Sequence, residues 1–184
     1  MKKTVVLFYV IAGIFLILGV SLYVFIQKSA TDYNFEIFSS EIGSDVKIVF
    51  DDMAVPHIYA ESETDAMFAL GYVHASERLW QMDLLRRAGG GELSELLGED
   101  MIENDKYLRT LGLRNAAIKD AAEFEHTSSE KTKSAALAYL AGLNTFIGEE
   151  NHPVEYLLLG ATPQEFTTVD MYKVAGFMAY SFAI

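Results

Sequence analysis

The segment that most limits how this chain can fold is its N-terminus, where residues 4–26 contain no charged side chain. As a helix, this run would span roughly 34 Å, about the thickness of the hydrocarbon core of a bilayer. Lys2 and Lys3 precede it, and positive charge on this flank favours the cytoplasmic side. We therefore expect residues 4–26 to enter the membrane and residues 31–184 to lie outside the cytoplasm, in the periplasm or the extracellular space.

A secretory signal peptide is the alternative interpretation of residues 1–30. The apolar region of such a peptide is usually shorter, about 7–15 residues. The nearby sequence that could serve as a cleavage site, Lys28-Ser29-Ala30, has a lysine where a small side chain is needed. We therefore expect an N-terminal membrane anchor or an uncleaved signal, and we expect secretion only if the signal is cleaved.

Charge is distributed unevenly along the chain. All 26 acidic residues lie after residue 30, together with 11 of the 14 Lys and Arg residues. This excess of acid argues against nucleic acid as a partner and against adhesion to anionic lipid, because phosphate groups are bound by clustered cations. The chain has no cysteine, so disulfides, thiolate metal sites and a cysteine nucleophile are excluded.

Beyond the apolar run, residues 31–43 form a polar stretch that we interpret as a tether. In the sequence "SDVKIVFDD", residues 44–52, apolar and polar side chains largely alternate, which predicts a strand. Pro56 ends or bends this strand, and residues 57–60 can form a second short one. We expect residues 44–184 to form an α+β unit in which helices predominate.

The pattern from Glu63 onward predicts a long helix over residues 63–88 that is apolar on most of its circumference and is therefore buried. Gly89-Gly90-Gly91 ends this helix, because glycine adopts the left-handed conformation at low cost. One narrow polar stripe follows the helix, and its members need hydrogen-bond partners inside the protein. The stripe consists of His74, Glu77, Arg78 and Gln81.

Further helices are predicted over three ranges: 92–97, about 101–122 and 128–147. Thr127 and Glu130 form a capping-box pattern at the start of the third helix. A last helix begins near Thr168, with Asp170 in its first turn, and its apolar stripe continues to Ile184 without a capping signal. A natural C-terminus rarely ends in this way, so we expect the sequence to be a truncated part of a longer one.

Two serine–lysine patterns resemble catalytic motifs. Ser44 with Lys47 and Ser128 with Lys131 match the S-x-x-K of penicillin-binding enzymes. The S-D-N motif that accompanies it in those enzymes is absent, and Ser128 also suits the start of a helix. We therefore interpret both patterns as structural.

The sequence also contains few candidate metal ligands that lie close together. His74 and Glu77 could supply two ligands, but the other histidines are scattered along the sequence at positions 57, 126 and 152. Asp51 and Asp52 could contribute oxygen atoms to a calcium site, although a turn before Pro56 explains them as well. From the residues alone we assign no catalytic site and no metal site.

One long stretch nevertheless closely resembles the N-terminal part of the penicillin acylase family. It reads "VKIVFDDMAVPHIYAESETDAMFALGYVHASERLWQMDLLRRAGGGELSELLGEDMIENDKYLRTLGL". Its motifs are V-x-I-x-x-D with P-H-I-x-A, then A-x-G-Y-V-H-A-x-[DE]-R-L-[WF]-Q-M, then R-R with G-x-L-[SA]-E-x-L-G. The resemblance covers about residues 46–182. Phe50 and Ala54 depart from the pattern at positions where arginine and glycine are frequent.

This resemblance implies an N-terminal-nucleophile hydrolase, in which a precursor cuts itself and the serine freed at the start of a second chain attacks an amide. The present chain would be the mostly helical first part of an αββα fold, preceded by a transmembrane helix, and would contain no catalytic residue. Its partner would be the downstream chain that carries the serine. The substrate would be a small acylated amide, such as a β-lactam side chain, an N-acyl homoserine lactone or an acylated peptide.

Two further expectations follow from the resemblance. The chain alone is expected to hydrolyse nothing, because the nucleophile and the groups that hold the oxyanion belong to the second chain. No metal site is implied in this chain, whereas calcium is compatible with the complete protein, through an acidic residue that would follow Ile184.

The resemblance also implies substrate-binding residues in the last helix, which would form a wall of the acyl-group pocket. Met178 and Phe182 would face an apolar acyl group. Ser181 stands where some relatives carry a gating arginine, which puts that gating in doubt here. The alternative for Met178 and Phe182 is a place in the core stripe of their helix.

The same likeness suggests what covers the helices. The polar stripe of residues 74–81 would hydrogen-bond to the downstream chain. Without that chain, the apolar faces of helices 63–88 and 168–184 lack a cover, so we expect residues 31–184 alone to be poorly soluble or molten. The alternative function is a non-catalytic, membrane-tethered remnant that binds a partner through these faces.

Overall fold

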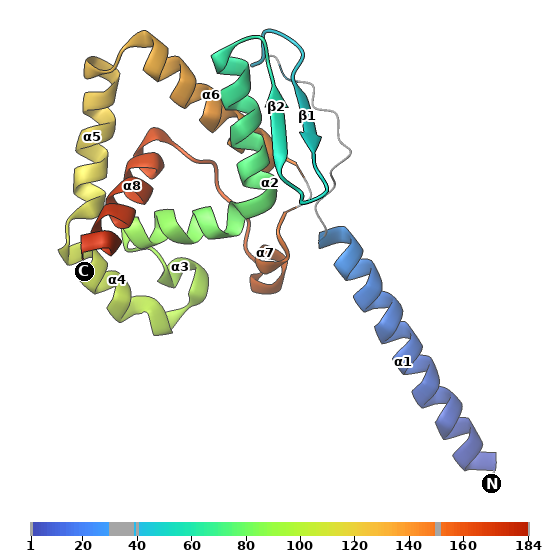
Figure 1. Cartoon of the computed structure of the whole chain (residues 1–184). Helices are drawn as coiled ribbons and strands as arrows, with labels where there is room; N and C mark the ends of the chain where they lie inside the picture. Colours follow the sequence, from blue (N-terminus) through green and yellow to red (C-terminus); the bar gives the residue numbers. More distant parts are fainter. Residues whose placement is uncertain (1, 30–38, 40, 150–151, 184) are drawn as a thin grey trace. The chain divides into compact units, whose positions relative to one another are not determined.

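The structure is a computed structural model that describes residues 2–29, 39, 41–149 and 152–183 (Figure 1). It divides into two compact units, residues 1–32 and residues 33–184. Most of the expected tether at 31–43 lies outside the described residues, as does Ala30 of the cleavage-like sequence.

The first unit consists of the helix α1 (Lys2–Ser29). Its stretch Val5–Phe25 has a mean hydropathy of 2.8 and is long and apolar enough to cross a membrane, and none of it is buried in the structure. A signal sequence near an N-terminus has the same properties. The helix is therefore confirmed, while anchor and signal remain two predictions for its role.

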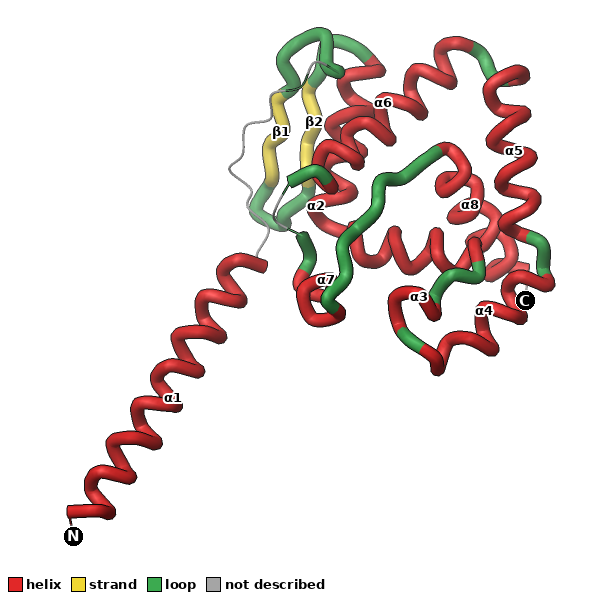
Figure 2. Tube along the Cα trace, turned by 180° about the vertical axis from the view of Figure 1, so that it is seen from behind, coloured by secondary structure: helices red, strands yellow, loops and turns green. Residues whose placement is uncertain are grey.

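The second unit contains a two-stranded sheet followed by helices (Figure 2). In chain order its elements are β1 (Lys47–Phe50), β2 (Pro56–Tyr59), α2 (Glu63–Gly90), α3 (Ser94–Leu97), a 3-10 turn (Glu99–Met101), α4 (Ile102–Thr110), α5 (Leu113–Thr127), α6 (Glu130–Ile147), α7 (Val154–Leu159) and α8 (Thr168–Ala183). The expected predominance of helices over a short β segment is confirmed.

β1 and β2 form an antiparallel hairpin in which Ile48 pairs with Ile58. Its turn is organised by Asp51, whose Oδ1 accepts hydrogen bonds from the backbone N–H groups of Met53 and Val55, both at 2.9 Å. Ala54, within this turn, has a φ of 59°. Turn formation is thus the observed role of Asp51, which agrees with the structural interpretation of this acidic pair.

α2 bends sharply at Arg78, whose φ of −141° and ψ of 17° are not helical (Figures 1 and 2). The sequence contains no proline there, so the bend was not expected. Ser62 caps the start of α2 by accepting a hydrogen bond from the N–H of Asp65. Gly91, with a φ of 63°, ends the helix as predicted.

The two halves of α2 are covered by different helices. Before the bend, α6 crosses so closely that a Cβ atom on Gly142 would lie 1.8 Å from the carbonyl oxygen of Phe68. After the bend, α8 crosses, and a Cβ atom on Gly89 would lie 2.3 Å from the carbonyl oxygen of Lys173. The expectation that the apolar face of α2 lacks a cover was therefore wrong. The core at α2 and α6 contains Tyr72, Ala75, Leu79, Leu140, Leu143, Phe146, Ile147, Tyr156 and Phe166.

Three details of the helices differ from the prediction. The single helix expected over about 101–122 is two helices, α4 and α5, separated at Gly112, which has a φ of 74°. The cap of α6 is Ser129, whose hydroxyl accepts the N–H of Thr132, whereas Thr127 donates back to a carbonyl of α5. The short helix α7 was not predicted.

α8 begins as predicted. The carboxylate of Asp170 accepts hydrogen bonds from the backbone N–H and the hydroxyl of Thr167, which fixes the first turn. Only the N-terminal half of the helix is well covered: its buried residues are Asp170 and Lys173. The apolar stripe does not continue into the core, because Met178 is 44% exposed and Phe182 is 84% exposed.

Candidate functional site

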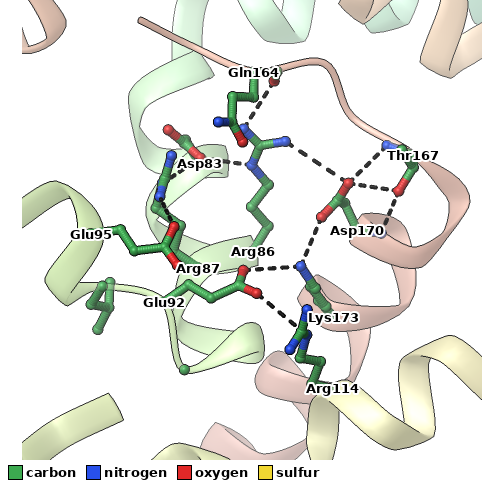
Figure 3. Close-up of polar contacts among 12 residues, drawn as sticks. Asp83, Arg86, Arg87, Glu92, Glu95, Arg114, Gln164, Thr167, Asp170 and Lys173 are labelled. Atoms are coloured by element: carbon green, nitrogen blue, oxygen red, sulfur yellow. Dashed lines mark hydrogen bonds and ion pairs between the residues drawn. The ribbon is translucent and has the colours of Figure 1, made fainter. Parts of the chain in front are cut away.

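The most elaborate polar arrangement of the described residues lies where the second half of α2 meets α8 (Figure 3). At its centre is Asp83, which is fully buried. Its Oδ1 accepts hydrogen bonds from Nε of Arg86 at 2.7 Å and from Nε of Arg87 at 3.0 Å. Its Oδ2 accepts one from the hydroxyl of Tyr156 at 2.8 Å, and burial, followed by the charge of Asp83, raises the pKa of that tyrosine. The carboxylate is therefore fully engaged as an acceptor.

Arg86 connects α2 to the segment that leads into α8. Its two terminal nitrogens donate to the carbonyl oxygens of Glu165 and Gln164, each at 2.9 Å. The guanidinium lies 3.9 Å from the ring centroid of Phe166, a favourable cation–π distance. One of its nitrogens is also 3.9 Å from Oδ2 of Asp170, in the first turn of α8. One side chain thus holds α2, the connecting segment and α8 together.

Lys173 makes the second connection between α2 and α8. Its Nζ donates to Glu92 at 3.0 Å and to Asp170 at 3.2 Å, and Glu92 also pairs with Arg114 of α5 at 3.4 Å (Figure 3). Burial raises the pKa of Asp170, but the hydrogen bonds from Thr167 and the charges of Lys173 and Arg86 outweigh it and leave the pKa below its usual range. Asp170 is therefore ionised at neutral pH and holds Lys173 in place.

We call this group the α2–α8 charge cluster. Its formal charges balance, since four cations face four anions: Arg86, Arg87, Arg114 and Lys173 against Asp83, Glu92, Glu95 and Asp170. Among the described residues, no buried side-chain nitrogen or oxygen lacks a hydrogen-bond partner. The cluster therefore fixes the positions of helices and offers no free base or nucleophile to a reactant.

The polar stripe of α2 lies elsewhere, on the surface around the bend. His74, Glu77, Arg78 and Gln81 are all exposed, so they do not form the internal network expected from the sequence. The hydroxyl of Tyr139 lies 3.0 Å from Nδ1 of His74, and Arg78 donates to Gln81 at 3.0 Å. Partial burial of its ring and the charge of Arg78 lower the pKa of His74, so its imidazole is neutral at pH 7. These side chains remain accessible because α6 and α8 pack on the other faces of α2.

The residues predicted to line the acyl pocket lie on the uncovered half of α8. Met178 and Phe182 are exposed, which excludes their alternative role as core residues of this chain. The hydroxyl of Ser181 donates to the carbonyl of Met178 at 2.7 Å. Near them, the hydroxyls of Tyr180 and of Tyr107 in α4 lie 2.7 Å apart. Their role toward a substrate stays a prediction.

The remaining sequence candidates have structural roles. Nζ of Lys131 pairs with Glu63 at 2.7 Å, and that hydrogen bond raises the lysine pKa, so Lys131 is not a base for Ser128. The described histidines have separate surroundings, His57 beside Asp51 and His152 beside the carbonyl of Ile147. Within the part of the chain that the structure describes, no group of three or more His, Cys, Asp or Glu residues could hold a metal ion.

Asp83, Arg86 and Arg87 were not singled out from the sequence. A signal was present, because an acid followed by arginines three and four positions later lies on one side of a helix. In a helix predicted to be buried, such a set must be paired internally. The distant partners at residues 164–173 had no comparable signal, since their approach depends on the bend of α2 and the crossing of α8.

Comparison with known proteins finds one matching family model and several similar proteins. The model of the penicillin amidase family matches residues 45–184. The chain is 40% identical over 124 residues to the penicillin acylase 2 proenzyme of Pseudomonas sp. (strain SE83), covering 67% of this chain and 16% of the relative. It is 37% identical over 106 residues to the acyl-homoserine lactone acylase QuiP of Pseudomonas fluorescens (strain Pf0-1), covering 58% and 12%. The chain thus spans less than a fifth of the length of these relatives.

Two further similarities agree with this. Penicillin G acylase of Escherichia coli is 32% identical over 152 residues, covering 79% of this chain and 18% of the relative. Among solved structures, the thermostable penicillin G acylase of Alcaligenes faecalis is similar with a TM-score of 0.65 and 26% identity. That likeness covers 76% of this chain and 74% of the solved chain.

Proposed function

Because this chain belongs to the penicillin amidase family, we propose that it is the N-terminal part of an acylase that hydrolyses amide bonds. The observation that carries the proposal is the family match over residues 45–184, which takes in the whole helical unit from β1 to α8. The matching relatives are named as acylases of penicillins and of acyl-homoserine lactones. Both substrate groups contain an acyl chain joined to a small amine through an amide.

In this proposal the catalytic nucleophile is a serine at the start of a downstream chain, released when the precursor cuts itself. One relative is named a proenzyme, which supports such processing. The α2–α8 charge cluster has no free base, which agrees with a supporting role for the present chain. The remainder of the protein would complete an αββα fold around the hairpin and helices described here.

The present chain would contribute to substrate binding through α8. Met178 and Phe182 are apolar, lie one helical turn apart and are exposed in this chain. Exposure is expected of residues that line a pocket whose other wall belongs to the downstream chain. Ser181 would lie beside them. The exposed stripe formed by His74, Glu77, Arg78 and Gln81 would hydrogen-bond to the downstream chain.

We further propose that the protein is exported, with α1 as its membrane anchor or signal, because α1 is long and apolar enough for either role. Calcium stays compatible with the complete protein, and the described acids of the charge cluster are already paired with cations.

The test of the function is to express the complete precursor, obtained by extending the reading frame past codon 184, and to follow its processing. We expect self-cleavage into two chains, a serine at the new N-terminus and release of amine from phenylacetyl and long-chain acyl amides. The chain of residues 31–184 alone should release none. A stop directly after codon 184, with a stable complex between this chain and another protein, would instead support the partner-binding remnant. The exposed side chains of Leu157 and Leu158 on α7 would be candidates for that contact.

The pocket role of α8 is tested separately in the processed enzyme. Replacing Met178 or Phe182 by alanine should change the preference among acyl groups by about 10-fold or more, because one methylene in an apolar pocket is worth roughly 10–200-fold. The stability of the isolated chain should change by less than about 0.5 kcal/mol, because exposed side chains contribute little to folding. Lower folded yield with an unchanged acyl preference would contradict the pocket role.

A further inference from the structure

The buried polar contacts of α8 are concentrated at its N-terminal end. Its buried residues, Asp170 and Lys173, lie in its first two turns, whereas the far end that carries Met178 and Phe182 is exposed. Among the described residues, that end is joined to another helix by the exposed hydrogen bond between the hydroxyls of Tyr180 and Tyr107. The far half also packs on the side chain of Leu113 in α5, since a Cβ atom on Gly176 would lie 3.8 Å from it, but this contact is apolar and the described buried ion pairs of α8 are all at its first two turns.

Lys173 is where the backbone and the side-chain constraints on α8 coincide. A Cβ atom on Gly89 would lie 2.3 Å from the carbonyl oxygen of Lys173, so the two helix backbones touch at this residue. The ammonium of the same residue reaches across to Glu92, just beyond the end of α2, and back to Asp170. The backbone contact sets the distance between α2 and α8, and the ion pairs set the angle of α8 about that contact.

The geometry of a rigid helix carries this constraint to the proposed pocket. Phe182 is nine residues beyond Lys173, which corresponds to about 13.5 Å along a helix axis. A tilt of about 5° at Lys173 therefore moves Phe182 by about 1 Å, close to the length that one methylene adds to an extended chain. Displacements of this size at a substrate contact change rates by up to about 100-fold.

From these observations we propose that Lys173 is a positioning residue that sets the tilt of α8 through Glu92 and Asp170, and thereby selects the length of the acyl group. This inference rests on the proposed acylase function. Lys173 does not touch the substrate in this proposal. It acts on Met178 and Phe182 through the helix that carries all three.

The experiment uses the complete, processed enzyme and a series of amides whose straight acyl chains differ by one methylene. Lys173→Met removes the ammonium but keeps the length of the side chain. We expect a change of about 10-fold in the ratio of kcat/KM between neighbouring acyl lengths. The change should appear mainly in KM, because the nucleophile is untouched. Lys173→Arg, which keeps the charge, should restore most of the original ratio.

Lys173→Met leaves Glu92 and Asp170 with one cation fewer and could prevent folding. The double variant Glu92→Gln/Lys173→Met removes one charge of each sign and keeps the cluster balanced, and Arg114, which loses Glu92, is 54% exposed at its side chain and stays solvated. This variant should fold and should show the same shift in acyl preference as Lys173→Met. If it folds and keeps the original preference, the proposal is overturned.

A matched control separates positioning from loss of stability. Leu140→Ala opens a cavity in the core between α2 and α6, away from the charge cluster. This substitution should lower stability without changing the ratio between acyl lengths. An equal shift in the ratio with Leu140→Ala would overturn the proposal. If the unmodified enzyme hydrolyses none of the amides, the proposed function itself fails, which is a different outcome from active variants with unchanged preference.

Discussion

Ala54 holds a backbone conformation that alanine rarely adopts. Its φ of 59° lies in the left-handed region, which costs a residue with a Cβ atom roughly 1 kcal/mol relative to glycine. The sequence resemblance pointed to the same position, because glycine is frequent there in the family. We expect Ala54→Gly to raise the free energy of unfolding by about 0.5–1 kcal/mol, measured by urea denaturation.

A matched control is available at Gly112, which has a φ of 74° and open space where a Cβ atom would lie. Gly112→Ala should lower the free energy of unfolding by about 1 kcal/mol, for the same reason with the opposite sign. If both substitutions change stability in the same direction, backbone conformation is not what governs these two turns.

Asp83 is the residue whose loss should be most damaging. In Asp83→Asn the two arginine Nε groups lose their carboxylate while the guanidiniums stay buried. Breaking a buried ion pair from one side costs about 3–5 kcal/mol, so we expect Asp83→Asn to unfold at a much lower urea concentration than the unmodified chain.

The exposed pair of Lys106 and Glu103 provides the comparison for this prediction, because it has the same chemistry in water. Glu103→Gln should change stability by less than about 0.5 kcal/mol. Similar losses for Asp83→Asn and Glu103→Gln would contradict the assignment of Asp83 as the centre of the cluster.

At the residue scale, the sequence predicted which polar side chains share a helix face better than it predicted whether that face is buried. It located His74, Glu77, Arg78 and Gln81 on one side of a helix, but whether that side faces the interior depends on which helices cover α2. Asp83 was overlooked because its role is defined by the buried arginines and by Tyr156, which lies 73 residues away. The structural interpretation of Ser128 came from the sequence alone, and the structure adds that Glu63 pairs with Lys131.

At the scale of elements, the crossing of α2 and α6 rests on glycine. A Cβ atom on Gly142 would lie 1.8 Å from a backbone oxygen of α2, so Gly142→Ala must push the two helices apart. We expect a loss of about 1–3 kcal/mol, as for other overpacked cores. Thermal unfolding of residues 31–184 measures it.

Gly176 of α8 is the matched control for this prediction, because a Cβ atom there would meet only a side-chain carbon of Leu113 at 3.8 Å. Gly176→Ala should raise stability, by up to about 1 kcal/mol, since alanine favours a helix more than glycine does. A stabilising Gly142→Ala would show that the close crossing is not required.

Element boundaries were predictable where a local signal fixes them. Gly91 ends α2, and Thr167 with Asp170 begins α8, because both signals act within one turn of the chain. The break at Gly112 was overlooked since an apolar helical pattern continues across it, and the bend at Arg78 has no proline to mark it. The cap of α6 was assigned to Thr127 when Ser129, two residues later, offered the same hydroxyl.

For the molecule as a whole, the free energy of unfolding is expected to fall in acid. The pKa of Asp65 is lowered by hydrogen bonds, first from Gly43; that of Asp105 is raised by burial but brought below its usual range by hydrogen bonds from Ser94 and Leu93. Asp170 is lowered as described above. Groups whose folded pKa is depressed contribute stability that is complete above the unfolded pKa of about 4 and is lost as pH falls through the folded values.

As the pH falls from 7 toward the pI, a decrease in net charge partly offsets this loss of stability. The chain carries a formal charge of −12 at pH 7 and has a pI of about 4.7, so self-repulsion declines as the pH approaches that value. We therefore expect the urea midpoint to change little down to about pH 5 and to fall steeply below about pH 4. Asp105→Asn should flatten that fall, and a midpoint that stays constant down to pH 3 would contradict the role of these carboxylates.

Low solubility of residues 31–184 remains a prediction, now with a narrower basis. The apolar face of α2 is covered, so the expected cause is the exposed apolar side chains of α7 and α8, which include Leu157, Leu158 and Phe182. Their accessibility predicts concentration-dependent association, measurable by light scattering, rather than a loosely packed core.

The partners of Arg86 lie 78 and 79 residues further along the chain. Ribosomes add roughly 5–20 residues per second, so the guanidinium is made about 4 to 16 s before those carbonyls exist. During that interval Asp83 can already pair with Arg86 and Arg87 from within the same helix, so both arginines have a carboxylate partner before α8 is made. The pairing of α2 with α6 becomes possible once residue 147 has been synthesised, whereas α8 is complete only after residue 183. The order of synthesis thus lets α6 pack on α2 before α8, the helix proposed to contact the acyl group, can dock.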